Sequence, residues 1–252
     1  MEVHAFPTIE RMADAAALDL CATIGAAIAR QGYANVMVAT GNSQLALYKS
    51  LARLGGAIDW AKVTCFHIDE YVGITGEHSA SFVKYLRERL EAVVRPRAFH
   101  FLQGDAPDPQ AECARYSALL AAHPLDICVL GIGENGHLGF NDPPPFGGAD
   151  FADKETVKIV RLDEACRQQQ VGEGHFPNLD AVPKTAFTTT IPGMLAAKTV
   201  IAVVPEKRKA AIVRQTLQRE EVSEAVPSTI LRTMTHVRLY LDGASASEIM
   251  KL

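Results

Sequence analysis

Polar residues directly follow an apolar run at Thr40-Gly-Asn-Ser43, the first of three such stretches in the sequence. A helix is predicted to begin here, and its unpaired N–H groups would suit an anion such as a phosphate. Thr40 or Ser43 is expected to cap this helix, and Gly41 allows a ligand to approach the backbone closely. Asn42 completes the candidate cradle. The stretch has neither the lysine of a P-loop nor the spacing of a dinucleotide fingerprint, so nucleotide binding is not supported. A simple capped turn is the alternative.

The second stretch is Phe66-His-Ile-Asp-Glu-Tyr-Val-Gly73. Adjacent carboxylates after a buried strand are costly unless they are solvated or used chemically. If the strand continues, Asp69 and Glu70 point to opposite faces, and only one of them needs to face a cleft. Together with His67 and His78 they could bind a metal. However, the histidines lack the i, i+4 spacing of a zinc helix, and we predict no metal site.

The third stretch, Gly131-Ile-Gly-Glu-Asn-Gly-His-Leu-Gly-Phe-Asn-Asp-Pro143, is rich in glycine and contains a histidine. His137 is a candidate acid or base, because its ordinary pKa lies near neutrality. The acidic residues Glu134 and Asp142 accompany it. The glycines resemble a dinucleotide-binding loop, but the chain continues into three prolines instead of opening a helix.

Two basic elements complete the candidate site. One is Arg167, and the other is Lys207-Arg-Lys209, which follows a predicted strand at the start of a predicted helix. Cations are unfavourable at that end of a helix dipole unless an anion is present. A bound phosphate would satisfy both elements, whereas ordinary solvated surface is the alternative for each.

Apolar strands and amphipathic helices alternate along the chain. Strands are predicted at 35–39, 63–68, 125–131, 157–162, 199–204 and 237–241, and helices at 9–28, 43–54, 81–94, 110–122 and 206–218. This alternation predicts an α/β fold: a doubly wound, Rossmann-like, mostly parallel sheet with helices on both faces. Ligands of such sheets bind beyond the carboxyl ends of the strands, where the three polar stretches lie. No linker or repeat interrupts the pattern, so one domain covering residues 1–252 is expected.

The composition of the chain limits the kinds of molecule that it is expected to bind. The 252 residues carry a net charge of −4, with 25 basic and 29 acidic residues, so no positive field would attract nucleic acid. The uncharged run Leu20–Ala29 ends after ten residues at Arg30, about half a membrane span. Five cysteines without a CxxC pair indicate reduced thiols. We therefore predict a cytoplasmic protein with a small-molecule ligand, and no nucleic-acid or membrane partner.

In order and spacing, these stretches resemble the glucosamine-6-phosphate deaminase (isomerase) family. The resemblance covers nearly the whole chain and is carried by the Thr40-Gly41 loop, 66–73, 131–143, Val182-Pro-Lys-Thr-Ala-Phe-Thr-Thr-Thr190, Lys209-Ala210 and Val226-Pro-Ser-Thr-Ile-Leu231. The related 6-phosphogluconolactonases share the glycine-rich core. After the histidine they usually read Thr-Ala-Ser-Leu-Phe-Pro, whereas this chain reads Leu-Gly-Phe-Asn-Asp-Pro.

The resemblance implies a cofactor-free conversion of glucosamine 6-phosphate to fructose 6-phosphate and ammonia. Asp69 would remove the C2 proton and return one at C1, and His137 would help to open the sugar ring. Phosphate and sugar would be held by Thr40–Ser43, Glu70, Arg167 and Lys209. The order of events is consistent, because the C2 proton becomes acidic only once the ring has opened to an aldehyde.

The chain departs from the family pattern at three positions. Asn135 replaces an Asp that usually forms a relay with the histidine, Asp142 replaces a longer Glu, and Met234 replaces a His near the C-terminus. Asp142 is expected to supply the charge for His137. Three alternatives stay open: a lactonase, an isomerase for another hexosamine phosphate, and a sugar-phosphate-binding regulator without turnover. The oligomeric state is not predicted.

Overall fold

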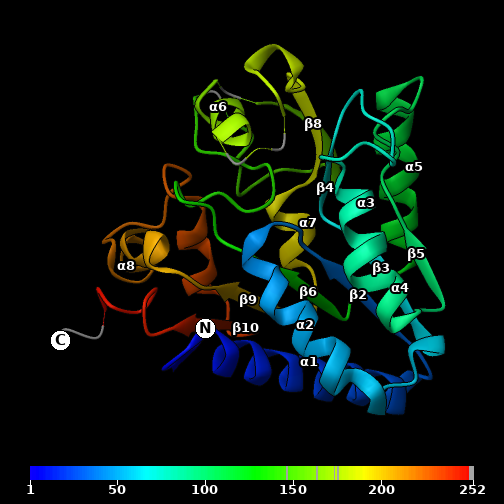
Figure 1. The fold of residues 1–252 in the computed structure, drawn as a ribbon, viewed down its shortest axis with the longest axis vertical. Coiled ribbons are helices and arrows are strands. Elements are labelled where there is room, and N and C mark those ends of the chain that lie inside the picture. The colour runs from blue at the N-terminus through cyan, green and yellow to red at the C-terminus, as the bar shows by residue number, and fades with distance from the viewer. Residues whose placement is uncertain (146, 163, 173, 175, 250–252) are drawn as a thin grey trace.

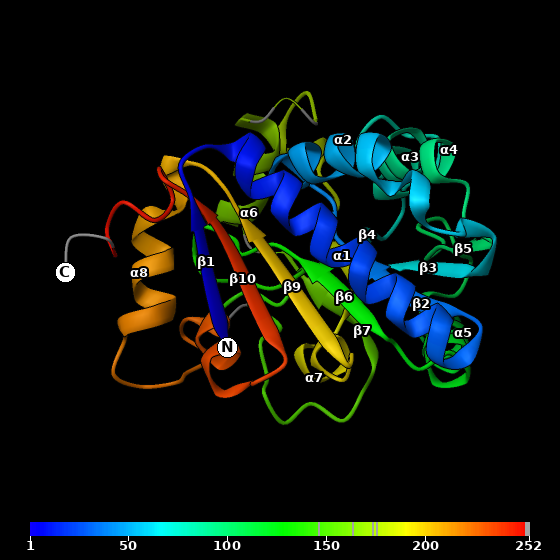
Figure 2. The same cartoon turned by 90° about the horizontal axis from the view of Figure 1, so that it is seen from below.

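The larger sheet is parallel throughout and forms the centre of the molecule (Figures 1 and 2). The computed structural model describes residues 1–249 except 146, 163, 173 and 175. The strand order is β1-β10-β9-β6-β2-β3-β5. The strands are β1 (Glu2–Phe6), β2 (Ala34–Val38), β3 (Val63–His67), β5 (Ala98–His100), β6 (Ile127–Leu130), β9 (Thr199–Val204) and β10 (Val237–Asp242).

Helices cover both faces of this sheet, which confirms the doubly wound prediction. Alternate strand residues separate the two layers: Val36 and Val38 of β2 pack with one set of helices, and Met37 with the other. The first set is α1 (Ile9–Gln31), α2 (Leu45–Leu54), α3 (Phe82–Leu86), a π-helical turn (Arg87–Glu91) and α4 (Ala92–Val94). The second is α5 (Pro109–Ala122), α7 (Ile191–Leu195) and α8 (Ala210–Gln218).

Helix α1 runs diagonally across the strands in Figure 2. Thr8 caps its first turn, and Gly32 ends it in the left-handed conformation at φ 86°. By length and composition α1 is apolar enough to cross a membrane, although the sequence analysis counted only ten uncharged residues within it. Here its apolar side chains pack in the core, and Met12 and Ile24 are fully buried.

A second, antiparallel sheet was not predicted. It contains β4 (Asp69–Tyr71), β8 (Thr185–Thr189) and β7 (Val157–Arg161) in the order β4-β8-β7. The run 157–162 was expected in the parallel sheet and instead pairs with β8. The residue pattern of a half-buried strand does not show which sheet the strand joins, because its pairing partners are distant in the sequence. Helix α6 (Glu164–Gly172) lies beside this sheet.

The chain reverses its direction of travel across the larger sheet between β2 and β6. From β2 it proceeds outward through β3 to β5, and then returns to β6 and continues to β9 and β10. Loops at such a switch point diverge and leave a crevice. Short 3-10 turns punctuate the loops at Asn42–Gln44, Gly55–Ala57, Trp60–Lys62, Leu179–Ala181, Lys207–Lys209 and Pro227–Thr233.

Four of the cysteines bear on the thiol prediction. Cys21, Cys65, Cys113 and Cys128 are buried and free, as expected for reduced thiols. The side chain of Cys166 lies outside the described residues.

Candidate active site

A cleft of about 210 Å³ lies at the switch point, beyond the carboxyl ends of β2, β3, β6 and β9. Parallel strands deliver their following loops to one edge of a sheet, so segments far apart in the sequence meet here. The predicted residues that line the cleft are Thr40, Gly41, Asn42, Ser43, Asp69, His137 and Lys209. Glu70, Asn135, Asp142 and Arg167 are not among its lining residues.

The Thr40–Ser43 loop forms one wall of the cleft. Gly41 adopts φ 93°, a conformation that favours glycine, and its carbonyl accepts a hydrogen bond from the Tyr85 hydroxyl at 2.8 Å. The expected capping is wrong, because no side chain caps the 3-10 turn or α2. The Ser43 hydroxyl instead accepts a bond from Gln44 Nε2 at 3.1 Å. Thr40 and Ser43 cap neither helix, and both residues line the cleft.

Lys209 adds a buried basic side chain to the lining of the same cleft. It ends the 3-10 turn that precedes α8, and only 8% of it is exposed. Its neighbour Arg208 also lines the cleft and pairs with Glu134 at 3.0 Å. Lys207 points elsewhere and donates to the hydroxyl of Ser247. Sequence alone could not show which members of this basic triplet face the ligand, because that depends on how the turn enters α8.

Arg167 does not reach the cleft, contrary to expectation. Its guanidinium donates to the carbonyl oxygens of Leu179 at 2.5 Å and Val182 at 3.0 Å. Gln170, one turn later on α6, lines the cleft and accepts a hydrogen bond from the Tyr71 hydroxyl. The hydrogen-bond donors of Arg167, which was expected to bind phosphate, are therefore used by the carbonyl oxygens of Leu179 and Val182.

Asp69 begins β4 and places its carboxylate in the cleft wall. Burial raises the pKa of Asp69 well above its ordinary value, and the adjacent charge of Glu70 raises it further. No described residue donates a hydrogen bond to its carboxylate. A carboxylate in this environment gains from accepting a proton, which is the property that a carbon-acid base needs.

Glu70 points away from Asp69, as the strand alternation predicted. Its carboxylate accepts hydrogen bonds from the Ser81 hydroxyl at 2.6 Å and the Val83 N–H at 3.0 Å. Burial raises the pKa of Glu70 although these hydrogen bonds act in the opposite direction. Glu70 does not line the cleft, contrary to the expectation that it holds substrate. Instead, Glu70 ties β4 to the start of α3.

His137 enters the cleft from the loop after β6, and a carboxylate stands behind it. Its Nδ1 lies 3.0 Å from Oδ1 of Asp142, and Asn135 Nδ2 donates to the same oxygen at 2.8 Å. Burial alone would raise the pKa of Asp142, but the contacts with His137 and Asn135 lower it overall. Asn135 and Asp142 thus reach the cleft through His137. The expectation that Asp142 is the acidic partner of the histidine agrees with this geometry.

Two glycines let the loop pass this closely. A Cβ on Gly133 would lie 2.2–2.3 Å from the ring of His137, and one on Gly139 would lie 2.7 Å from Ile68 and 3.4 Å from Oδ2 of Asp69. Gly139 also has φ 58°. The imidazole of His137 therefore packs directly against the backbone of Gly133. The backbone of Gly139 passes close to the carboxylate of Asp69.

Replacement of Gly133 by alanine should displace the His137 ring, because the added methyl would overlap it. We expect kcat to fall about 10²-fold, the usual cost of misplacing a catalytic group by about 1 Å. The Michaelis constant should change little, since the cradle residues are untouched. Steady-state kinetics would test this, with Gly56→Ala as the control because a Cβ there meets open space. Equal kinetics for both variants would contradict the contact.

The possible metal ligands are not brought together. His67 is fully buried with a pKa lowered to about 3 by burial, and its Nε2 accepts the Leu102 N–H. His78 accepts the N–H of Ala80. Within residues 1–249, the masked positions excepted, no group of three or more His, Cys, Asp or Glu side chains could hold an ion.

A family profile described as glucosamine-6-phosphate isomerases/6-phosphogluconolactonase matches residues 7–139. The chain belongs to this family. A glucosamine-6-phosphate deaminase of Exiguobacterium is 36% identical over 83% of the chain and 78% of its own length. One of Streptococcus equi subsp. zooepidemicus is 33% identical over 87% and 89%.

Solved structures agree with the family assignment. A monomeric glucosamine-6-phosphate deaminase superposes with a TM-score of 0.87 at 30% identity, over 98% of this chain and all of its own. The 6-phosphogluconolactonase of Trypanosoma brucei gives a TM-score of 0.79 at 17% identity, covering 98% of both chains. This second likeness shows the shared fold alone.

Several residues that line the cleft of this family member carry no recognisable signal in the sequence. Tyr85, Gln170 and Ser79 line the cleft without having been proposed, and Arg208 was proposed only as part of its basic triplet. Only Arg208 had a usable signal, since it lies within the basic triplet that was singled out. The others come from helices and loops that approach the cleft from the side, and no local motif marks them.

Proposed function

We propose that this chain is a glucosamine-6-phosphate deaminase, which converts glucosamine 6-phosphate and water to fructose 6-phosphate and ammonia. The observation that carries the proposal is the pairing of two proton-transfer groups in one cleft. Asp69 is a buried carboxylate with a raised pKa, and His137 is backed by Asp142 at 3.0 Å. The deaminase relatives and the similar deaminase structure support this choice of substrate.

The phosphate would bind at the end of the cleft formed by Thr40–Ser43 and Lys209. Hydroxyls, a glycine backbone and a buried ammonium group offer charge-assisted hydrogen bonds to its oxygens. Arg208 at the rim adds a second cation. Neutral sugars have nothing to match this charge, so recognition would favour phosphate esters.

The reaction would proceed by successive proton transfers. His137 gives its proton to the ring oxygen and takes one from the C1 hydroxyl, and the ring opens to the aldehyde. Asp69 removes the C2 proton while His137 protonates the aldehyde oxygen, giving an enolamine. Asp69 then returns the proton to C1, and the nitrogen at C2 loses a proton to His137. The resulting C2 imine takes up water and expels ammonia, leaving the ketone. Protons and water balance the sequence, so these steps require no redox cofactor.

An ammonia-release assay across several sugars tests the proposal. Glucosamine 6-phosphate should release ammonia and yield fructose 6-phosphate, whereas glucosamine itself should be a very poor substrate. Galactosamine 6-phosphate and N-acetylglucosamine 6-phosphate define selectivity, and 6-phosphogluconolactone tests the lactonase alternative. Faster lactone hydrolysis than ammonia release would overturn the proposal. So would tight binding of glucosamine 6-phosphate without turnover, which would indicate a regulator.

Replacement of Asp142 by asparagine should impair ring opening specifically. The amide keeps the shape of the side chain but removes the negative charge beside His137. The alkaline limb of the turnover profile, where the proton donor is lost, should therefore move to lower pH. Turnover of the cyclic substrate should fall more than that of an open-chain analogue whose ring-closing hydroxyls are blocked. Equal losses on both would instead assign Asp142 to structure or substrate binding.

We further propose that residues 1–252 act as one catalytic domain in the cytoplasm on an amino-sugar phosphate. The assignment to a single domain is supported by the cleft, which is lined both by Asp69 of the smaller sheet and by Lys209, which follows β9 of the larger sheet.

A further inference from the structure

The backbone of Asp142 is held from behind by residues 147–153, which we call the bracing segment. The Ala149 N–H donates to the Asp142 carbonyl at 3.0 Å. A Cβ on Gly147 would lie 2.1 Å from that carbonyl oxygen, so the two backbones are in direct contact. The bracing segment therefore limits where Asp142 can place its carboxylate.

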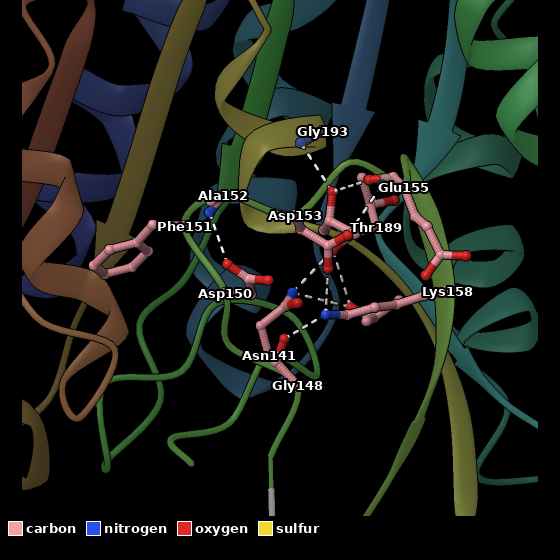
Figure 3. Close-up of polar contacts among 12 residues, drawn as sticks. Asn141, Gly148, Asp150, Phe151, Ala152, Asp153, Glu155, Lys158, Thr189 and Gly193 are labelled. Carbon is pink, nitrogen blue, oxygen red and sulfur yellow. Dashed lines mark hydrogen bonds and ion pairs between the residues drawn. The ribbon is translucent and has the colours of Figure 1, made fainter. Parts of the chain in front are cut away.

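A single side chain anchors the bracing segment at two points. Lys158 Nζ donates to the Gly148 carbonyl at 2.5 Å and pairs with Oδ2 of Asp153 at 2.5 Å (Figure 3). Only 14% of the lysine side chain and 10% of the aspartate side chain are exposed. A nearly buried ion pair is a poor source of net stability, because desolvation offsets the attraction. It does, however, fix geometry, since both partners are expensive to leave unpaired.

The anchor belongs to the sheet that carries Asp69. In the smaller sheet, Lys158 lies opposite Thr188, and Thr188 lies opposite Asp69. Directly opposite residues of neighbouring strands point to the same face, so these three side chains share one face. Thr188 Oγ1 also accepts the N–H of Phe140 at 3.1 Å. Through Phe140 and Thr188, the loop that carries His137 and Asp142 is therefore hydrogen-bonded to the same face of the sheet as Asp69.

This fastening matters because an aspartate side chain is short. With one methylene group, Asp142 cannot extend to follow the imidazole if its backbone retreats. Its 3.0 Å separation from Nδ1 of His137 is set by the position of the main chain. A retreat of about 1 Å would be enough to break the contact.

We propose that Lys158 is a positioning residue, which holds the bracing segment so that Asp142 stays against His137. The inference rests on the proposed function for its catalytic consequence, but the contact itself can be measured without substrate. No direct contact of Lys158 with the sugar is invoked.

The test is Lys158→Met, compared with the charge-preserving Lys158→Arg. The Met variant should lower kcat for cyclic glucosamine 6-phosphate about 10- to 100-fold, with an unchanged Michaelis constant. An open-chain analogue should be turned over normally, and the Arg variant should recover most of the activity. Lys62→Met is the matched control, since Lys62 pairs with Asp59 on the exposed surface at 3.2 Å.

A second variant covers the possibility that a lone buried Asp153 prevents folding. The combination of Lys158→Met with Asp153→Asn removes both charges and leaves no buried charge unpaired. The same split between cyclic and open-chain substrates is expected. Thermal unfolding of each variant would report how much is lost to stability alone.

NMR separates this inference from the proposed function. The Nδ1 resonance of His137, recorded without substrate, should shift in Lys158→Met and in the double variant but not in Lys62→Met. An unchanged resonance, or equal losses on both substrates, would overturn the positioning role. If the unmodified protein released no ammonia, the proposed function would fail, while the resonance would still decide the inference.

Discussion

Replacement of Asp69 by asparagine should reduce turnover about 10³- to 10⁴-fold, within the range that a general base contributes to catalysis. Asparagine has nearly the same shape but cannot accept the C2 proton. Affinity should be almost unchanged, because the cradle at Thr40–Ser43 and Lys209 is separate from this carboxylate. Steady-state kinetics with glucosamine 6-phosphate, together with exchange of the C2 hydrogen in deuterated water, would measure both effects.

The pH profile gives an independent test of the same assignment. Burial raises the pKa of Asp69, so the proton-accepting form is present only above that raised value. Activity should therefore be lost, as pH falls, at a higher pH than an ordinary aspartate would give. Near-normal C2 exchange in the asparagine variant would refute Asp69 as the base. Glu70→Gln is a useful comparison, since it alters the neighbouring carboxylate, which faces away from the cleft.

Replacement of Lys209 by alanine should weaken binding of the phosphate ester by about 10- to 150-fold. A hydrogen bond to a charged group contributes about 1.5–3 kcal/mol, and each 1.36 kcal/mol corresponds to a factor of ten. The loss should appear mainly in the Michaelis constant, because phosphate is held equally before and during the reaction. Inhibition by inorganic phosphate should weaken in parallel.

Neighbouring cations provide matched controls for this variant. Lys207→Ala removes the same side chain two residues earlier, where it contacts Ser247, and should leave the Michaelis constant unchanged. Arg208→Ala should raise it, since Arg208 lines the cleft. Arg167→Ala should mainly affect stability, because its guanidinium holds the Leu179 and Val182 carbonyls. An unchanged Michaelis constant in Lys209→Ala would place the phosphate elsewhere.

The position of the cleft could be predicted from the sequence because local patterns determine where parallel strands end. The apolar runs before Thr40, Asp69 and Gly131 were recognisable as buried strands, and parallel pairing brings their ends to one edge. Lys209 was found for the same reason, since it follows β9. The opposite directions of Asp69 and Glu70 followed from strand alternation alone.

Other features depend on contacts that sequence patterns do not record. Arg167 was assigned to phosphate by resemblance, yet the turn at Leu179–Ala181 folds back and binds its guanidinium. The antiparallel sheet was missed because β4 is only three residues long and its partner β8 lies more than 100 residues away. The bracing of Asp142 by Lys158 depends on that sheet, so it could not be predicted before the sheet was known.

The proposed phosphate anchor and the proposed carbon-acid base belong to different sheets. Lys209 and the Thr40–Ser43 loop extend from the parallel layer, whereas Asp69 starts the antiparallel one. Ring opening would also depend on the parallel layer, because His137 follows β6, so only the proton transfer at C2 is assigned to the smaller sheet. In this proposal, substitutions in the smaller sheet can change the proton transfer at C2 of the sugar. The larger sheet would still bind the phosphate group of the substrate.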